Sequence, residues 1–272
     1  MSINAHTPFA RAIAVASATL VFALSSVAAQ SPSTYVAPPI TPADRTAAFP
    51  DLGRMNAREM MPEDPFNRFM LFDQLEAQDA DDGAVLSWDF RGWAGRNANR
   101  LWIRSEGERA SGTTERAELQ LLWGRPIARW WDMVAGVRQD FRPGPSQGWA
   151  AFGIQGLAPY RFELEATAFV GEAGRAAVRF EAEYELLITN RLILEPLIEV
   201  NWYAQDDAVR GIGSGLSSAE SGLRLRYEFR REIAPYVGLT REKRFGGTAD
   251  LLRAAGIDTD ETRLVAGVRL WF

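Results

Sequence analysis

The sequence predicts an all-β fold, a closed antiparallel transmembrane β-barrel of about 12 strands preceded by a disordered N-terminal segment. Three observations support this fold class. The chain begins with the pattern of a secretory signal, and from about residue 68 onward it consists of short segments that alternate polar and apolar side chains. The last of these segments ends in a C-terminal phenylalanine.

Residues 1–29 have the order of charge and hydrophobicity of a signal peptide. Arg11 precedes an apolar stretch over residues 12–27 that ends in small residues, as a signal peptidase site requires. The stretch is shorter than a membrane-spanning helix, so we expect cleavage after Ala29. Cleavage would remove His6, the one histidine of the chain, together with Arg11, and would move the formal net charge from -5 to -6.

Composition excludes several kinds of chemistry. The 272 residues include no cysteine, and the expected mature chain has no histidine, so thiolate metal sites and histidine-based triads are excluded. A glycosidase built on two carboxylates stays formally open, but nothing in the sequence places such a pair in a cleft. The net charge of -5, without a basic tail, argues against nucleic acid as a partner. We therefore expect no enzyme.

Residues 30–67 are rich in Pro, Ala, Ser and Thr, which predicts a disordered periplasmic segment. This segment contains Met55, Met60 and Met61, and Met70 follows just beyond it. The methionine thioether is a soft ligand that suits Cu(I), so two or three of these side chains could close on one copper ion. Three methionines in a linker could equally be incidental.

Residues 68–272 form the predicted barrel. In residues 179–186 every odd position is charged and every even position is apolar or aromatic, and residues 223–230 alternate in the same way. A period of two predicts strands with two chemically different faces. The predicted strands lie near 68–77, 84–94, 100–107, 114–124, 130–141, 148–157, 160–170, 175–188, 191–203, 217–230, 234–244 and 261–272. Their even number, with short turns at one end and longer loops at the other, is typical of an outer-membrane barrel.

The polar strand faces favour a membrane barrel over a soluble β-sandwich. They carry mostly Arg and Glu, and Lys243 is the one lysine of the chain, whereas soluble sheets usually place lysine at their edges. Arginine–carboxylate pairs tolerate partial burial because the guanidinium group is planar and bidentate. The apolar faces should therefore meet lipid, and the polar faces should line the lumen.

The last predicted strand carries the sharpest single signal. Its apolar face runs from Leu264 to the C-terminal Phe272, and Arg263 and Arg269 lie on the other face. This pattern resembles the C-terminal signature of outer-membrane barrels that the barrel assembly machinery reads. The expected location is therefore the bacterial cell outer membrane, and the expected partners are its lipid and, through Phe272, the assembly machinery.

Alternation predicts which charged side chains line the lumen. They are Arg104, Glu106, Arg116, Glu118, Glu163, Glu165, Arg179, Glu181, Glu183, Glu185, Glu195, Glu199, Arg224, Arg226, Glu228, Arg263 and Arg269. Arginine and glutamate must interdigitate there, either as a structural ion network or as a polar pathway for ions. The best cation candidates are the column Glu181, Glu183 and Glu185 and the facing pair Glu163 and Glu165. Carboxylates favour hard ions, so this face alone would not select copper.

Eight ordered segments of the barrel carry a resemblance to a known family. They are residues 70–76, 79–83, 101–109, 136–143, 156–160, 181–185, 211–216 and 245–249. Together they resemble the copper resistance protein B family of bacterial outer-membrane proteins, over about residues 68–272. The resemblance implies a role in copper tolerance, by export or by holding copper in the periplasm, and implies periplasmic copper-handling proteins as partners. Family members typically carry a longer N-terminal region dense in Met and His, from which this chain departs.

Two functions follow as expectations. In the first, the protein is an outer-membrane copper resistance protein that captures Cu(I) weakly at Met55, Met60 and Met61 and passes it to or through the lumen. In the alternative, the barrel is a channel for small anionic solutes with no specific copper role. Arginine ladders would then steer the solutes, and the candidates are Arg224, Arg226, Arg263 and Arg269.

Overall fold

The structure is a computed structural model that describes residues 38–48, 64–80 and 83–272. It divides into two units, Met1–Asn56 and Ala57–Phe272. In the first unit, helix α1 (Pro42–Ala48) has no buried residue. Thr41 and Asp44 cap it reciprocally, because the Asp44 amide donates to Thr41 Oγ1 (3.2 Å) and the Thr41 amide donates to Asp44 Oδ2 (2.8 Å). The segment 30–67, predicted to be disordered, thus contains a short helix. The predicted signal peptide lies outside the described residues.

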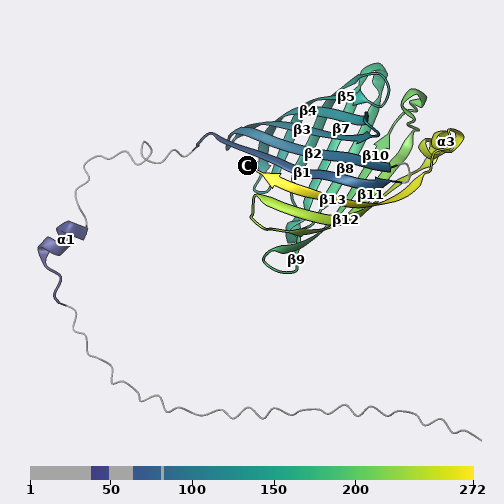
Figure 1. Cartoon of the computed structure of the whole chain (residues 1–272). Coiled ribbons are helices and arrows are strands. Elements are labelled where there is room, and N and C mark those ends of the chain that lie inside the picture. The colour runs from purple at the N-terminus through teal and green to yellow at the C-terminus, as the bar shows by residue number, and fades with distance from the viewer. Residues whose placement is uncertain (1–37, 49–63, 81–82) are drawn as a thin grey trace, which may run out of the picture. The chain divides into compact units, whose positions relative to one another are not determined.

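The second unit is a β-barrel (Figure 1). Its strands are β1 (Asn67–Ala80), β2 (Gly83–Arg96), β3 (Asn99–Ala110), β4 (Thr113–Ala128), β5 (Trp131–Arg142), β6 (Gln147–Leu157), β7 (Glu163–Gly171), β8 (Ala176–Glu183), β9 (Leu186–Leu187), β10 (Leu192–Tyr203), β11 (Gly215–Tyr227), β12 (Ile233–Arg244) and β13 (Asp260–Trp271). Its helices are α3 (Gly246–Ala254) and the single 3-10 turns η1 (Pro159–Arg161), η2 (Glu172–Gly174) and η3 (Ala208–Arg210). No described helix is long and apolar enough to cross a membrane.

Antiparallel pairing closes the sheet on itself. Each strand pairs with the next along the chain, and β13 pairs with β1. β8 and β9 both pair with β10 and together form one interrupted strand, so the barrel has twelve strands, as predicted. The interruption lies opposite Pro196 of β10. Tyr184 donates its amide to the Pro196 carbonyl (3.2 Å), but proline has no amide hydrogen to return, so regular pairing stops there.

The two ends of the barrel differ in their connections. One end, named here the short-turn end, carries connections 97–98, 129–130, 158–162, 184–191 and 228–232 together with the C-terminus. The other, the long-loop end, carries 81–82, 111–112, 143–146, 172–175 and the two longest connections, 204–214 and 245–259. The predicted difference in connection length between the two ends therefore depends mainly on connections 204–214 and 245–259. The loop expected after β12 contains helix α3, which the sequence analysis missed.

Helix α3 is held against the neighbouring long loop by one threonine. Thr248 is buried, accepts the Gly213 amide at its Oγ1 (2.8 Å) and shares a hydrogen bond with the Ser217 hydroxyl (2.9 Å). In the same loop Asp206 accepts the Ser214 amide (2.6 Å), and this hydrogen bond lowers the pKa of the exposed carboxyl below its ordinary value. The longest connections are thus tied together at the long-loop end.

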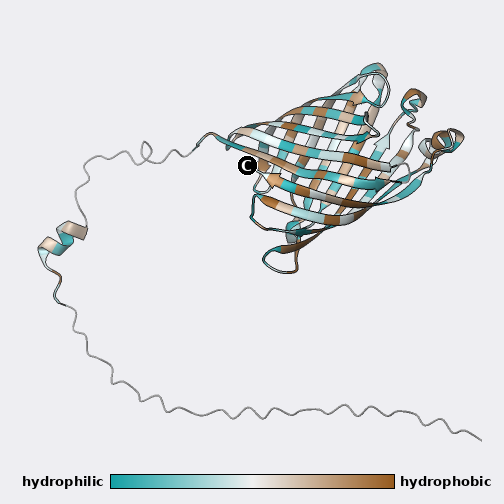
Figure 2. Cartoon of the chain, in the orientation of Figure 1, coloured by the Kyte–Doolittle hydropathy of each residue, from teal (hydrophilic) through white to brown (hydrophobic). Residues whose placement is uncertain are grey.

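The strands alternate hydrophobic and polar side chains (Figure 2), as the period of two predicted. Large apolar residues on the outer face, such as Leu119, Leu121 and Trp123 of β4, are exposed. The inner face is not uniformly polar. A buried apolar cluster lines one wall, and its members are Leu122, Val134, Trp149, Ala151, Phe169 and Ala177, with Trp102 and Tyr203 packed against them. The alternation of charges in the sequence does not predict this wall.

Candidate functional site: a charged lumen

The candidate site is the lumen, where the strand register turns most charged side chains of the barrel. In the described strands the inward positions carry seventeen carboxylates and eleven arginines. The carboxylates are Asp73, Glu76, Asp89, Glu106, Glu108, Glu118, Asp132, Asp140, Glu163, Glu165, Glu181, Glu183, Glu195, Glu199, Glu220, Glu242 and Glu261. The arginines are Arg91, Arg100, Arg104, Arg116, Arg138, Arg179, Arg224, Arg226, Arg244, Arg263 and Arg269. The lumen therefore has a surplus of negative charge.

Every one of these arginines is neutralised by a carboxylate. Each has a guanidinium nitrogen within 3.2 Å of a carboxylate oxygen. Among the described residues, Glu163 and Glu220 of the inward carboxylates take part in no ion pair. The arrangement can therefore offer free carboxylates to a cation, whereas the inward guanidinium groups of the strands are all paired. Arg129 and Arg142, which line the cavities at the two ends of the lumen, take part in no ion pair among the described residues.

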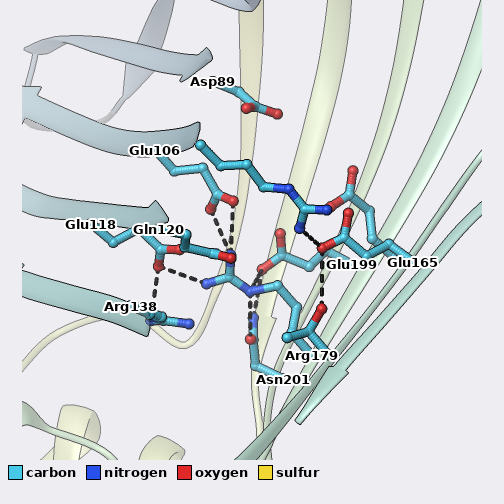
Figure 3. Close-up of polar contacts among 12 residues, drawn as sticks. Asp89, Glu106, Glu118, Gln120, Arg138, Glu165, Arg179, Glu199 and Asn201 are labelled. Carbon is cyan, nitrogen blue, oxygen red and sulfur yellow. Dashed lines mark hydrogen bonds and ion pairs between the residues drawn. The ribbon is translucent and has the colours of Figure 1, made fainter. Parts of the chain in front are cut away.

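Arg179 of β8 forms the centre of the network and crosses the lumen (Figure 3). Its Nη1 lies 2.8 and 2.9 Å from the two carboxylate oxygens of Glu106 on β3, and its Nη2 lies 2.8 Å from Glu118 Oε2 on β4. Its Nε donates to the side-chain oxygen of Asn201 (3.3 Å) and lies 3.7 Å from Glu199. Since β8 does not pair with β3 or β4, this side chain joins opposite walls of the barrel.

Arg138 of β5 continues the network into the apolar wall. It contacts Glu118 (2.8 Å) and Asp140 (2.6 Å), and Asp140 also accepts the indole N–H of Trp149 (2.8 Å). The guanidinium group lies over the ring of Phe169, 4.7 Å from its centroid. The charges at the centre are thus held in place by packing as well as by hydrogen bonds, because their partners belong to the buried cluster.

A second group of ion pairs lies nearer the short-turn end and depends on a bulge in β1. The pairing register shifts between Phe72 and Gln74, which turns Asp73 into the lumen as an extra inward residue. Asp73 then accepts hydrogen bonds from Arg269 (2.6 Å) and Arg91 (3.2 Å). Arg91 in turn lies 3.6 Å from Glu181 across the lumen. Alternation from the inward Leu71 also places Asp73 inside, but Asp73 was not among the predicted lumen charges.

A third group is buried almost completely. The carboxylate of Glu76 on β1 accepts both Nε and Nη2 of Arg224 (3.2 Å each) and the hydroxyl of Tyr236 (2.9 Å). The exposed fractions of the Glu76 and Arg224 side chains are 0% and 2%. This pair therefore belongs to the framework of the barrel and not to a surface that a solute reaches.

The network divides the interior into cavities. A cavity of about 460 Å³ at the short-turn end is lined by Glu163, Glu165, Glu181 and Glu183 among others. A cavity of about 430 Å³ at the long-loop end is bounded by Glu118, Arg138 and Arg179. A space of about 50 Å³ near Glu106 and Glu199 lies at mid-height. The cross-lumen ion pairs therefore constrict the passage between two vestibules.

The predicted cation candidates are brought together only in part. Glu163 pairs with Glu183 and Glu165 with Glu181 across β7 and β8, as predicted. Arg104 neutralises Glu165, however, and Arg91 lies 3.6 Å from both Glu181 and Glu183. Glu185 lies in the interruption after β8 and is held by Arg226 and Arg269 (3.1 Å). Among the described residues no group of three or more Asp, Glu or His side chains is arranged to hold a metal ion.

The predicted methionine site is not assembled by the described residues. Met70 is 44% exposed and lies on the outer face of β1, because its neighbour Leu71 points inward. Met55, Met60 and Met61 lie outside the described residues.

Glu228, predicted to line the lumen, follows the end of β11 and lies in connection 228–232. Several inward charges were missed, and alternation would have found Asp89, Arg91 and Arg138 from their neighbours.

The closed twelve-stranded barrel with a charged lumen defines the class of closed antiparallel β-barrels. The chain is similar to a solved structure of the NanC porin, with a TM-score of 0.50 and 11% identity over 75% of this chain and 99% of that one. That likeness concerns the fold alone. The chain belongs to the copper resistance protein B family, whose model, described as copper resistance protein B precursor, matches residues 66–272.

Two curated relatives agree with this membership. A copper resistance protein B homolog of Pseudomonas syringae pv. tomato is 51% identical over 235 residues, which cover 86% of this chain and 79% of the relative. The copper resistance protein B of Escherichia coli is 50% identical over 235 residues, covering 86% of this chain and 78% of the relative. The resemblance found in the sequence is thus confirmed.

Proposed function

We propose that this protein is a non-enzymatic barrel of the outer membrane that contributes to copper resistance by admitting or holding copper cations. Its family and the names of its relatives support the copper role. The observation that carries the choice of a cation is the charge of the lumen, in which seventeen inward carboxylates face eleven arginines that are all ion-paired. A narrow, weakly polarisable passage with one sign of excess charge concentrates ions of the opposite sign.

Recognition of copper and attraction of cations are assigned to different parts of the chain. Carboxylates are hard ligands and attract cations without selecting copper, whereas methionine thioethers favour Cu(I). Met55, Met60 and Met61 precede the barrel in the sequence and would supply the soft ligands. Glu163, the carboxylate without an ion pair in the cavity at the short-turn end, would offer a cation a first contact, and the ion pairs around Arg179 would restrict passage beyond it.

The lumen geometry disfavours the alternative of an anion channel. The four arginines of the predicted ladder are already held, Arg224 by Glu76, Arg226 by Glu195, Arg263 by Glu261 and Arg269 by Asp73. An anion would have to displace a carboxylate from each of them, at the cost of leaving that carboxylate without its partner. A cation meets no such requirement at Glu163 or Glu220.

Reversal potentials of the purified protein in planar bilayers test the sign of the transported charge. Under a potassium chloride gradient we expect potassium to permeate more readily than chloride. The double variant Glu163→Gln/Glu220→Gln should lower this preference, because it removes two carboxylates without breaking an ion pair. The matched control is Glu172→Gln, an exposed residue of connection 172–175 outside the lumen. Anion preference of the wild-type protein would contradict the proposal.

The copper role is tested in cells. A strain that lacks the protein should lose copper tolerance, and the full-length protein should restore it. A version without residues 30–63 keeps the whole barrel, and we expect it to restore less tolerance if the methionine segment captures copper. Failure of the full-length protein to restore tolerance, despite normal amounts in the membrane, would refute the copper role.

A further inference from the structure

The short-turn end carries a ring of exposed arginines that take no part in the ion pairs of the lumen, although Arg129 also lines the cavity of about 460 Å³. Its members are Arg68, Arg125, Arg129, Arg161, Arg191, Arg230 and Arg231, and all are exposed. Arg68 and Arg125 lie on outward positions at the ends of β1 and β4, and the others lie on the connections. Among the described residues none of these seven side chains forms an ion pair or a hydrogen bond. We call this set the arginine rim.

Carboxylates on the same connections do not balance the rim. Glu228 and Glu232 lie on connection 228–232, and Glu185 is already bound to Arg226 and Arg269. Seven unpaired guanidinium groups therefore face two carboxylates of the connections and the C-terminal carboxylate of Phe272. The rim therefore carries an excess of positive charge, whereas the lumen beside it carries an excess of negative charge. Because the rim arginines form no ion pair with the described carboxylates of the lumen, neutralising the lumen does not explain them.

The long-loop end is built differently. There Arg175 and Arg210 both lie beside Asp207, at 3.0 and 3.5 Å. Arg241 and Lys243 share Asp260, and Arg253 lies 2.9 Å from Asp250. Most cations at that end are thus neutralised within the chain, with Arg109 and Arg142 as exceptions among the described residues, so more uncompensated positive charge lies at the short-turn end.

Exposed aromatic rings accompany the rim. They are Trp123, Trp130, Tyr160, Phe162, Phe229 and Phe272, between 41% and 85% exposed. Trp130 follows Arg129, Tyr160 and Phe162 flank Arg161, and Phe229 precedes Arg230. Aromatic rings settle at the interface between hydrocarbon and headgroups, and long arginine side chains beside them reach to the depth of the lipid phosphates.

We propose that the arginine rim binds the phosphate groups of anionic phospholipids in the leaflet that faces the short turns. The planar guanidinium group binds phosphate through two parallel hydrogen bonds, and unpaired clusters of arginine beside a membrane surface favour lipids with net negative charge. The rim is an annular binding surface, because its residues come from β1, β4 and four separate connections. This inference rests on the proposed membrane location and is independent of copper.

Fluorescence quenching by brominated lipids tests the inference. The full-length protein is reconstituted in phosphatidylcholine bilayers that contain either brominated phosphatidylglycerol or brominated phosphatidylcholine, and the quenching of tryptophan fluorescence gives the relative association constant. Trp123 and Trp130 lie beside the rim and report on it. We expect phosphatidylglycerol to bind several-fold more tightly than phosphatidylcholine, and we expect salt to reduce the difference.

Two variants locate the binding. Replacing Arg129, Arg161, Arg230 and Arg231 by Gln should bring the ratio of association constants close to one. The control replaces Arg109, Arg142 and Arg253 of the long-loop end by Gln and should leave the ratio unchanged. If the fourfold variant does not fold, Arg129→Gln/Arg161→Gln and Arg230→Gln/Arg231→Gln should each lower the ratio in part.

The outcomes separate this inference from the proposed function. A ratio of one for wild-type protein that has inserted as a folded barrel would overturn the lipid site and leave the copper role intact. An equal loss in the control variant would overturn the assignment to the rim. Failure of the chain to insert into bilayers would instead contradict the membrane location itself.

Discussion

Arg179 on β8 contacts Glu118 on β4 through two hydrogen bonds, with Nη2 2.8 Å from Oε2 and Nη1 3.1 Å from Oε1, although the residues are 61 positions apart in the sequence. The exposed fractions of the two side chains are 4% and 2%. Because the strands lie on opposite walls, this contact braces the barrel across its lumen and also narrows the passage. One pair thus links the stability of the barrel to its permeability.

Replacing Arg179 by Met should both destabilise and open the barrel. Loss of the guanidinium group leaves Glu106 and Glu118 buried with fewer partners, which costs about 3–5 kcal/mol of unfolding free energy. Urea unfolding in lipid vesicles measures this loss, and single-channel conductance should rise. The control is Arg241→Met, an exposed residue paired with Asp260, which should cost at most about 1 kcal/mol. Equal effects of the two variants would contradict a bracing role for Arg179.

Glu76→Gln should destabilise the barrel more than Tyr236→Phe. The first change leaves the buried guanidinium group of Arg224 without a charged partner, at a cost of about 3 kcal/mol or more. The second removes a hydrogen bond to a charged acceptor, the 2.9 Å contact of Tyr236 with Glu76, at about 1.5–3 kcal/mol. Urea unfolding of both variants in the same vesicles gives the comparison. A smaller loss for Glu76→Gln would show that the ion pair is not part of the framework.

Deletion of Phe272 should reduce the amount of folded barrel in the membrane. Its backbone closes the barrel, since the Phe272 amide donates to the Met70 carbonyl (2.9 Å) and the Met70 amide donates to the Phe272 carbonyl (3.1 Å). Its exposed side chain is the feature that the assembly machinery is expected to read. Heat-modifiable gel migration of membrane fractions quantifies the folded form. The conservative variant Phe272→Tyr should keep most of it, and normal levels after deletion would count against both roles.

Replacing Met55, Met60 and Met61 together by Leu should weaken Cu(I) binding about tenfold or more, because leucine keeps the size of methionine and removes the soft sulfur ligand. Competition with a coloured Cu(I) chelator measures the affinity. The structure supplies the control, since Met70 faces outward on β1 and Met70→Leu should leave the affinity unchanged. An unchanged affinity of the triple variant would place the copper site elsewhere in the chain.

Much of the fold could be predicted because the side chains of a barrel strand alternate, residue by residue, between two chemically different faces. The strand predicted near 100–107, for example, lies within β3. The strand predicted near 234–244 matches β12 to within one residue. Helix α3 was missed because nine residues between two strands give too short a pattern to distinguish a helix from a loop. The interruption after β8 depends on Pro196 in the neighbouring strand, and segment 175–188 alone does not contain that information.

The lumen could be predicted less well, for a different reason. Alternation assigned Arg179 and Glu118 to the same face of the sheet, but their contact depends on the diameter of the closed barrel. Asp73 is in phase with the inward Leu71, but the bulge beside it reverses the alternation before Glu76, and neither carboxylate was among the predicted lumen charges. Trp149 and Phe169 place apolar side chains at inward positions of their strands. The pattern of charges does not predict them, because it marks only the inward positions that are charged.

The hydrogen bonds between Met70 and Phe272 join the first strand to the last residue of the chain. Six further residue pairs, from Leu71 with Trp271 to Asp79 with Leu264, join the same two strands, so the ring can close only after β13 has been made. Before β13 has been made, the outer edge of β1 has no partner strand within the chain. An unpaired strand edge can pair with a second chain, so covering this edge during synthesis would protect the protein from aggregation.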